Sequence, residues 1–136
     1  MRRIDARTGA QHWDMEITGA VSASMLIGAN ALSDFVYVAA ENPSVLYALS
    51  KADGQLQWTL ALNAGRTSAP IALYGQDGSG YVVQGDEGVV FLLDGLVGSV
   101  YASIEVEGSV VGSPAAFENM ITLATSNGKL YGISVN

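Results

Sequence analysis

The stretch "ALSKADGQLQW", Ala48 to Trp58, decides the fold, because "IDARTGAQHW", Ile4 to Trp13, repeats its pattern near the start of the chain. In both stretches a short apolar segment leads into a turn that contains Gly, and a Trp follows that Gly by four residues. A third version, "LLDGLVGSVYA", is altered: Ala102 stands at the Trp position, with Tyr101 beside it. One pattern in three versions predicts a repeat protein.

The three versions are evenly spaced along the chain. Gly9, Gly54 and Gly98 lie 45 and 44 residues apart, and other segments recur with nearly the same period. These segments are "VLYAL", "VVFLL" and "KLYGI", and the pair "SAPIAL" and "GSPAAF", with "SASMLI" as a looser first copy. A period of about 40–45 residues with four short strands per unit is typical of β-propeller blades. Stacked blades bury the apolar faces that a single sheet cannot cover alone.

Strand patterns fill the chain, and there is no long apolar stripe at helical spacing. In the middle of the chain we expect strands at 45–50, 55–62, 68–74 and 80–84, separated by turns rich in Gly, Asn and Asp. A β-sandwich or a lipocalin-like barrel would also fit the number of strands, but neither explains evenly spaced copies. We therefore predict an all-β fold, a partial β-propeller of about three four-stranded antiparallel blades.

Composition and charge exclude several functional classes. The 136 residues suffice for one domain, and the absence of Cys excludes disulfides, thiolate metal sites and a Cys nucleophile. The net charge is −7; Arg2, Arg3 and Arg7 are half of the basic residues, and no Lys or Arg lies between Arg66 and Lys129. We interpret the acidic residues as a solvated rim, and we expect no nucleic acid partner because such a surface repels polyanions. The longest uncharged stretch carries Gly, Ser and Asn throughout, so we expect no membrane span.

Several residue types that often carry chemistry are present, but their patterns favour structural roles. His12 is the only His, and we interpret it as a polar strand residue beside Trp13. Asp77 in "GQDGSG" and the pair Asp86-Glu87 in "QGDEG" offer oxygen ligands between glycines, as calcium loops do. Hairpin turns use the same residues, and neither stretch has the spacing of an EF-hand. We therefore predict turns at both places.

Glu105 and Glu107 alternate with apolar residues and so lie on one face of a predicted strand. Paired carboxylates can perform acid–base chemistry, but a solvated strand face is the simpler interpretation here. We therefore assign no residue to a catalytic, cofactor-binding or metal site, and we predict no cofactor.

The pattern Ala-Leu-x-x-x-x-Gly-x-x-x-Trp, followed by a Ser-Pro strand, resembles the tryptophan-docking repeat of PQQ-like, quinoprotein-type β-propellers. The segments that carry the resemblance are "IDARTGAQHW", "YALSKADGQLQW" and "GSPAAFENMITLATSNGKLYGI". In that family a blade is usually described as starting at the Ser-Pro strand and ending at the Trp strand. The resemblance therefore implies that Trp13 and Trp58 are wedges between successive blades.

This family description divides the chain into four parts. Residues 1–20 would be the last two strands of a preceding blade, 21–65 and 66–109 two whole blades, and 110–136 a C-terminal blade that lacks its outer strand. Three repeats are fewer than the roughly four to eight blades of a closed propeller, and an open arc would leave sheet faces and edges exposed. We expect either that the chain is the C-terminal part of a larger propeller, or that two or more copies close the ring.

Function is implied only by the resemblance. Quinoprotein dehydrogenases of this kind use a calcium ion, a catalytic Asp and commonly two adjacent cysteines, whereas this chain has no Cys and offers no cofactor motif. We therefore expect no enzyme activity, and a propeller scaffold that binds an unidentified protein or ligand as part of a larger exported protein, periplasmic or at the cell surface. A fragment of a quinone-dependent dehydrogenase, and an accessory or sensor propeller fused to an enzyme domain, remain alternatives.

Overall fold

The computed structural model describes residues 1–135 except 5, 22, 63–66, 76 and 118, and this part of the chain consists mainly of β-strands. A short 3₁₀ helix, η1 (Asn30–Leu32), precedes β4. In chain order the strands are β1 (Arg2–Ile4), β2 (Gln11–Asp14), β3 (Leu26–Ile27), β4 (Phe35–Ala40), β5 (Val45–Ser50), β6 (Leu56–Ala61), β7 (Ile71–Tyr74), β8 (Gly80–Gly85), β9 (Glu87–Asp94), β10 (Val100–Phe117), β11 (Met120–Thr125) and β12 (Leu130–Ser134).

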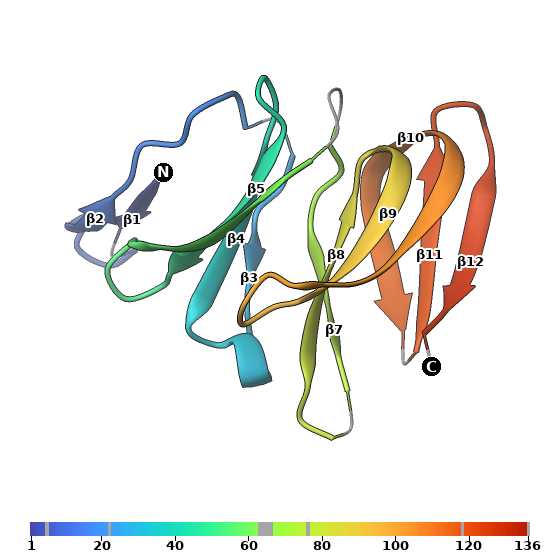
Figure 1. The fold of residues 1–136 in the computed structure, drawn as a ribbon. Helices are drawn as coiled ribbons and strands as arrows, with labels where there is room; N and C mark the ends of the chain where they lie inside the picture. The colour runs from blue at the N-terminus through green and yellow to red at the C-terminus, as the bar shows by residue number, and fades with distance from the viewer. Residues whose placement is uncertain (5, 22, 63–66, 76, 118, 136) are drawn as a thin grey trace.

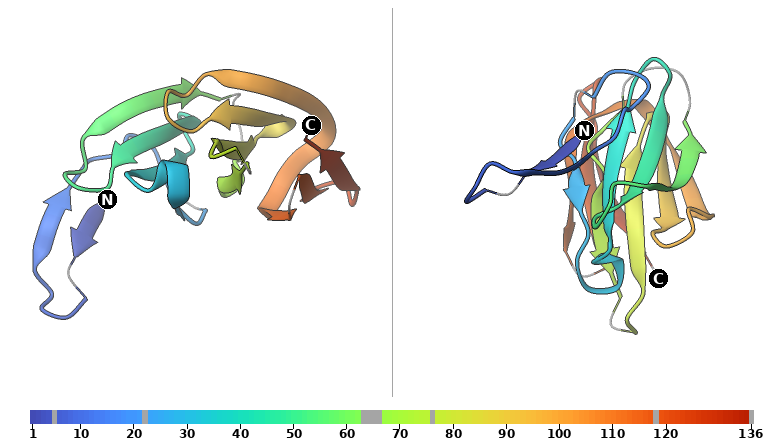
Figure 2. Two further views of the ribbon diagram at one scale, coloured as in Figure 1. Left: turned by 90° about the horizontal axis from the view of Figure 1, so that it is seen from below. Right: turned by 90° about the vertical axis from the view of Figure 1, so that its left-hand side faces the viewer.

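The strands form three antiparallel sheets that stand side by side (Figure 1). A hairpin of β1 and β2 comes first, followed by a four-stranded sheet in the order β3-β4-β5-β6 and a six-stranded sheet in the order β7-β8-β9-β10-β11-β12. Seen from below, the sheets curve into an arc, with the β1–β2 hairpin at one end and β12 at the other (Figure 2). The prediction of an all-β chain is therefore confirmed.

The six-stranded sheet joins segments that the sequence predicts as two blades, 66–109 and 110–136. It does so because β10 is continuous: its first half pairs with β9, up to Ser109, and its second half pairs with β11, from Val110. The register shifts on both sides of this point, and Gly108 has a φ of 82°, a conformation that favours glycine. The strand therefore bends from one group of strands into the next (Figure 1). The blade boundaries themselves stay a prediction.

Two apolar cores fill the spaces on either side of strands β7 to β9. Successive side chains of a strand point to opposite faces, so neighbouring residues of β8 enter different cores. Val82 packs with Tyr37 and Leu46 of the four-stranded sheet, whereas Val83 packs with Ile121 and other residues of β10 to β12. Both valines are completely buried. Sheets that bury both faces against neighbours are the arrangement that the repeat predicts.

Candidate functional site

The first joint between sheets is the contact of Trp13 with the turn between β5 and β6. The indole of Trp13 is buried against Gly54, where an added Cβ would lie 2.3 Å from ring atom Cε3. Trp13 Nε1 donates a hydrogen bond to the Lys51 carbonyl oxygen at 2.9 Å. Gly54 has a φ of 73°, which glycine adopts without strain. Only glycine therefore permits both this turn and this approach of the ring.

The second joint repeats this geometry one unit later. Trp58 on β6 lies against Gly98, where an added Cβ would be 2.6 Å from the ring, and Gly98 also has a positive φ. Trp58 Nε1 donates to the Gly95 carbonyl oxygen at 3.2 Å, and Gly95 occupies the same repeat position as Lys51. The two Trp residues are therefore equivalent anchors, each docked on a glycine turn of the next sheet.

Tyr37 supports the second joint and was not identified from sequence. Its hydroxyl donates a hydrogen bond to the Gly95 carbonyl oxygen at 2.8 Å, and its ring lies 5.8 Å from that of Trp58. Burial, followed by the nearby charges of Tyr74 and Asp94, raises the pKa of Tyr37 far above its ordinary value. The other repeats have no Tyr at the position of Tyr37, so the repeat pattern alone does not predict its role in this joint.

The third version of the repeat has Ala102 at the Trp position, with Tyr101 beside it. Ala102 pairs with Leu92 as Trp58 pairs with Ala48. A register shift precedes both residues, and it contains Tyr101 in the third version and Gln57 in the second. The Tyr101 ring packs against the ring of Tyr81, with centroids 5.6 Å apart. Tyr101 is nevertheless 65% exposed. It therefore stands at the repeat position of Gln57 and is not the counterpart of the two Trp residues.

Two shallow cavities meet at Tyr101, and we call them together the Tyr101 groove. One, of about 140 Å³, is apolar and lies between β9, β10 and the end of β12. The other, of about 200 Å³, is lined by Tyr81, Asp77 and Asn119 among others. Within the described residues, β12 pairs only with β11, so its other edge is unpaired beside the groove. This end of the arc therefore combines an exposed aromatic ring with a free strand edge.

The outer face of β10 to β12 is also uncovered, and we call it the end face. Its residues alternate with those that enter the core, and they are Ala115, Thr122, Ala124, Leu130 and Gly132. Leu130 is 83% exposed. It pairs with Ala124 as Leu46 pairs with Ala39, yet Leu46 is completely buried under the following sheet. The end face thus has the same construction as a covered face of the arc.

At the other end of the arc, the four-stranded sheet faces the β1–β2 hairpin across a cavity of about 400 Å³. We call this side the start face; it is formed by Met25, Ile27 and Val36, beside Trp13. Ile27 pairs with Val36 as Ala72 pairs with Val82. The second pair lies in the core, whereas Ile27 is 67% exposed. The hairpin therefore covers this face only in part.

Asp77 and the pair Asp86-Glu87, which the sequence analysis considered as calcium ligands, lie in separate places. Asp77 is in the turn between β7 and β8, where its carboxylate accepts hydrogen bonds from the Ser79 hydroxyl and backbone N–H, and these lower its pKa. Asp86 is completely buried between β8 and β9 and accepts a hydrogen bond from the Glu87 backbone N–H at 2.7 Å. Glu87 is exposed. Asp86 therefore does not belong to the solvated acidic rim that composition suggested.

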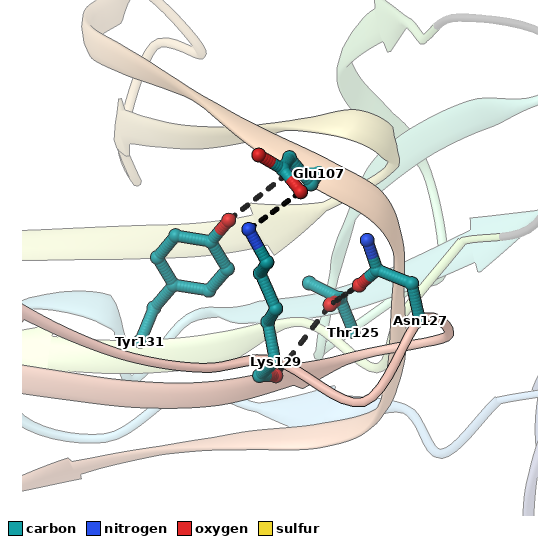
Figure 3. A network of polar contacts seen from close by, with 5 residues as sticks. All are labelled: Glu107, Thr125, Asn127, Lys129 and Tyr131. Atoms are coloured by element: carbon teal, nitrogen blue, oxygen red, sulfur yellow. Dashed lines mark hydrogen bonds and ion pairs between the residues drawn. The ribbon is translucent and has the colours of Figure 1, made fainter.

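Glu107 belongs to a surface network with residues of the turn between β11 and β12 (Figure 3). Its carboxylate lies 2.6 Å from Lys129 Nζ, and its backbone N–H donates to the Tyr131 hydroxyl at 3.1 Å. The hydrogen bond with Glu107 raises the pKa of Lys129. Glu105 is exposed on the same strand. Glu107 is therefore engaged in an ion pair and is not a member of a paired-carboxylate site with Glu105.

His12 is exposed on β2, while the neighbouring Trp13 is buried, as alternation along a strand requires. Within the described ranges, no three residues among His, Asp and Glu lie close enough to share a metal ion. In the same part of the chain, no helix has the length and apolar character needed to span a membrane.

Comparison with known proteins identifies similar chains. A profile of the family described as "Outer membrane protein assembly factor BamB" matches residues 1–92 and 43–136, which together span the whole chain. No curated protein matches the chain by sequence. The crystal structure of BamB from Moraxella catarrhalis is 27% identical and superposes with a TM-score of 0.80 over 98% of this chain. The chain spans only 39% of that structure.

The β-propeller domain of Cps50 (Swd1) from Myceliophteria thermophila is also similar, with a TM-score of 0.65, 15% identity and coverage of 87% of this chain and 37% of that one. At that identity the likeness concerns the fold alone. Together with the BamB match it confirms the partial β-propeller predicted from the repeat. The resemblance to PQQ-like repeats is confirmed by the family profile.

Proposed function

Because the chain belongs to the PQQ-like β-propeller family of the outer membrane protein assembly factor BamB, we propose that it is a non-catalytic scaffold that binds another protein outside the cytoplasm. The observation that carries this proposal is the match to BamB over nearly the whole chain, with a TM-score of 0.80. We assign the chain to the process that the name of BamB states, the assembly of outer membrane proteins. The chain spans 39% of BamB, so this assignment rests on part of that protein.

The turn between β9 and β10 offers a surface for such a partner. Leu96 and Val97 are both exposed there, whereas the equivalent turn between β5 and β6 carries Ala52 and Asp53. In repeat proteins the blades supply the framework, and binding specificity lies in turns and loops that differ between repeats. We therefore assign the exposed aliphatic pair to partner binding.

The proposal is tested by exporting the chain in a bacterium that lacks its own BamB and measuring the amount of folded outer membrane proteins. We expect partial recovery with the natural chain, and loss of that recovery with Leu96→Ser/Val97→Ser. Ala52→Ser, at the equivalent position of the preceding turn, is the matched control and should behave as the natural chain. No recovery from a chain that is exported and folded would contradict the proposed process.

The absence of catalysis is tested separately. The purified chain is mixed with pyrroloquinoline quinone and Ca²⁺, and reduction of an electron-accepting dye is followed with simple alcohols and aldose sugars as substrates. The scaffold assignment predicts the same rate with and without the chain. Dye reduction that depends on the chain and saturates with quinone would instead support a quinone-dependent dehydrogenase.

A further inference from the structure

Four glycines of the chain follow a residue whose side chain can close onto the backbone. The carbonyl carbon of an Asn or Asp side chain can be attacked by the backbone nitrogen of the next residue, which gives a five-membered imide. Glycine permits this attack best, because it has no side chain and adopts the widest range of backbone angles. The four glycines are Gly54, Gly78 and Gly95, each preceded by Asp, and Gly128, preceded by Asn127.

Two of these glycines lie under neighbouring side chains. At Gly54 an added Cβ would lie 2.3 Å from the Trp13 ring, and at Gly95 it would lie 2.5 Å from the Leu32 side chain. Both glycines also donate their N–H groups to backbone carbonyl oxygens. Ring closure requires the nitrogen to leave its acceptor and move toward the preceding side chain, and close packing resists such a movement. We therefore expect no imide at either place.

The other two glycines lie in open turns. Gly78 and Gly128 have φ values of 85° and 83°, and an added Cβ would meet nothing within 4 Å at either one. Each N–H donates within its own turn, to the carbonyl oxygen three residues earlier, at 3.2 Å for Gly78 and 3.1 Å for Gly128. Because nothing packs over these glycines, the turns can open locally without breaking a joint between sheets.

The side chains that precede these two open glycines differ in their chemistry. Hydrogen bonds from the Ser79 hydroxyl and backbone N–H lower the pKa of Asp77 and keep its carboxylate ionised, so it has no leaving group. The Asn127 carboxamide is neutral and can release ammonia. The Thr125 hydroxyl donates a hydrogen bond to Asn127 Oδ1 (Figure 3). Such a donor stabilises the negative charge that develops on the oxygen when the carbon is attacked.

We propose that Asn127 is a site of spontaneous covalent modification, at which the Gly128 nitrogen attacks Asn127 Cγ. The bond between this nitrogen and Cγ forms, the Cγ–Nδ2 bond breaks, and the proton of the Gly128 N–H leaves with the ammonia. Water then opens the imide at one of its two carbonyl groups, which gives aspartate or isoaspartate at position 127. In total one water enters and one ammonia leaves. This inference rests on the local structure of the turn and does not depend on the proposed function.

The two products affect the structure differently. Glu87 occupies the repeat position of Asn127 and precedes Gly88, which has a φ of 80°, so this kind of turn accepts a carboxylate. In isoaspartate the backbone runs through the side chain and gains one atom, which lengthens the turn. Ser126 of the turn donates its N–H to the Ser109 carbonyl oxygen at 2.8 Å and accepts the Ser109 N–H at 3.0 Å. Isoaspartate should therefore loosen β10 where it bends.

Peptide mapping by mass spectrometry is the first test. After incubation of the folded chain in warm, slightly alkaline buffer, the peptide that contains Asn127 should show the mass increase of NH₂ replaced by OH, in two products separable by chromatography. Asn127→Gln, whose longer side chain must close a larger ring, is the control and should remain unmodified at this position. If Asn127 stays intact in the folded chain but is converted in urea, the folded turn prevents the reaction and the proposal is overturned.

Two substitutions distinguish the role of packing from that of the Asn-Gly pair alone. Asp77→Asn and Asp53→Asn each create such a pair, the first in the open turn of Gly78 and the second where Gly54 lies under the Trp13 ring. In the folded chain the first pair should react at least about tenfold faster than the second. In urea the two pairs should react at equal rates. Equal rates in the folded chain would overturn the selection of Asn127 by the structure.

Hydrogen exchange tests the effect on β10. The isoaspartate product, separated after incubation, should exchange the Ser109 amide proton faster than the unmodified chain does. The amide protons of β4, which belongs to a different sheet, should exchange at the same rate in both forms. The aspartate product should match the unmodified chain at both places. Unchanged exchange at Ser109 in the isoaspartate product would overturn the predicted loosening of the bend.

Discussion

At the scale of residues, the joints between sheets depend on single indoles. Removing the ring of Trp58 leaves a cavity against Gly98 and leaves the Gly95 carbonyl without one of its donors. We expect Trp58→Ala to lower the free energy of unfolding by about 3–5 kcal/mol. Urea titration followed by circular dichroism measures the loss. Trp58→Phe keeps most of the packing and should lose much less; a negligible loss in Trp58→Ala would place the ring outside the joint.

Comparing two glycines with similar backbone angles separates two costs of a substitution: strain in the backbone, and a clash with the Trp58 ring. Gly98 and Gly78 have φ values of 78° and 85°, so alanine is strained at both. At Gly98 the new Cβ would also lie 2.6 Å from the Trp58 ring, whereas at Gly78 it would meet nothing within 4 Å. Gly98→Ala should therefore be less stable than Gly78→Ala by about 1–3 kcal/mol in urea titrations. Equal losses would show that the ring does not rest on Gly98.

Tyr37 makes stability depend on alkaline pH. Burial raises its pKa in the folded chain above the ordinary value of about 10 that it has when unfolded. The unfolded chain therefore releases this proton first, so the contribution of Tyr37 is complete below about pH 10 and is lost progressively as the pH rises further. The free energy of unfolding should fall above pH 10, and it should fall less in Tyr37→Phe. Parallel pH curves for the two proteins would contradict a buried, neutral Tyr37.

Some of these residues could be predicted from sequence and others could not. The two Trp anchors and their glycines could be predicted because the same residue types recur at the same spacing in two repeats. The third copy has Ala102 at the Trp position, as the regular count gives, but the packing of the neighbouring Tyr101 ring on Tyr81 could not be read from the repeat. The burial of Asp86 was also missed, since a turn sequence does not reveal what packs over it.

At the scale of elements, a strand is stabilised only where both faces are covered. Leu46 and Leu130 occupy the same repeat position on β5 and β12, but only Leu46 is buried in the single chain. We expect Leu46→Ala to lower the free energy of unfolding by about 2–5 kcal/mol. Leu130→Ala should change it by less than about 0.5 kcal/mol. Similar losses at both positions would mean that the end face is already covered.

Strand positions followed from alternation and turn residues, and several predicted ranges lie close to the observed ones: 45–50 for β5, 55–62 for β6 and 80–84 for β8. The continuity of β10 could not be predicted. Gly108 has strand residues on both sides, and from sequence it could mark either a turn between two strands or a bend within one. Only the pairing of β10 with both β9 and β11 decides between these alternatives.

At the scale of the whole molecule, the repeat period was enough to predict the architecture, because only stacked sheets explain evenly spaced copies. The partner and the process were not predictable in this way. They depend on turns such as Leu96-Val97, which lie outside the repeat pattern and differ from one repeat to the next. The family match supports the proposed process and does not identify the partner.

The central claim is that each anchor ring rests on the glycine turn of the neighbouring sheet. Nuclear Overhauser spectroscopy tests it directly. Ring protons of Trp13 should show strong effects to the Hα protons of Gly54, and those of Trp58 to Gly98, with both glycine resonances shifted upfield by the rings. Glycine resonances at ordinary positions, with the Trp rings close to unrelated residues, would contradict the account.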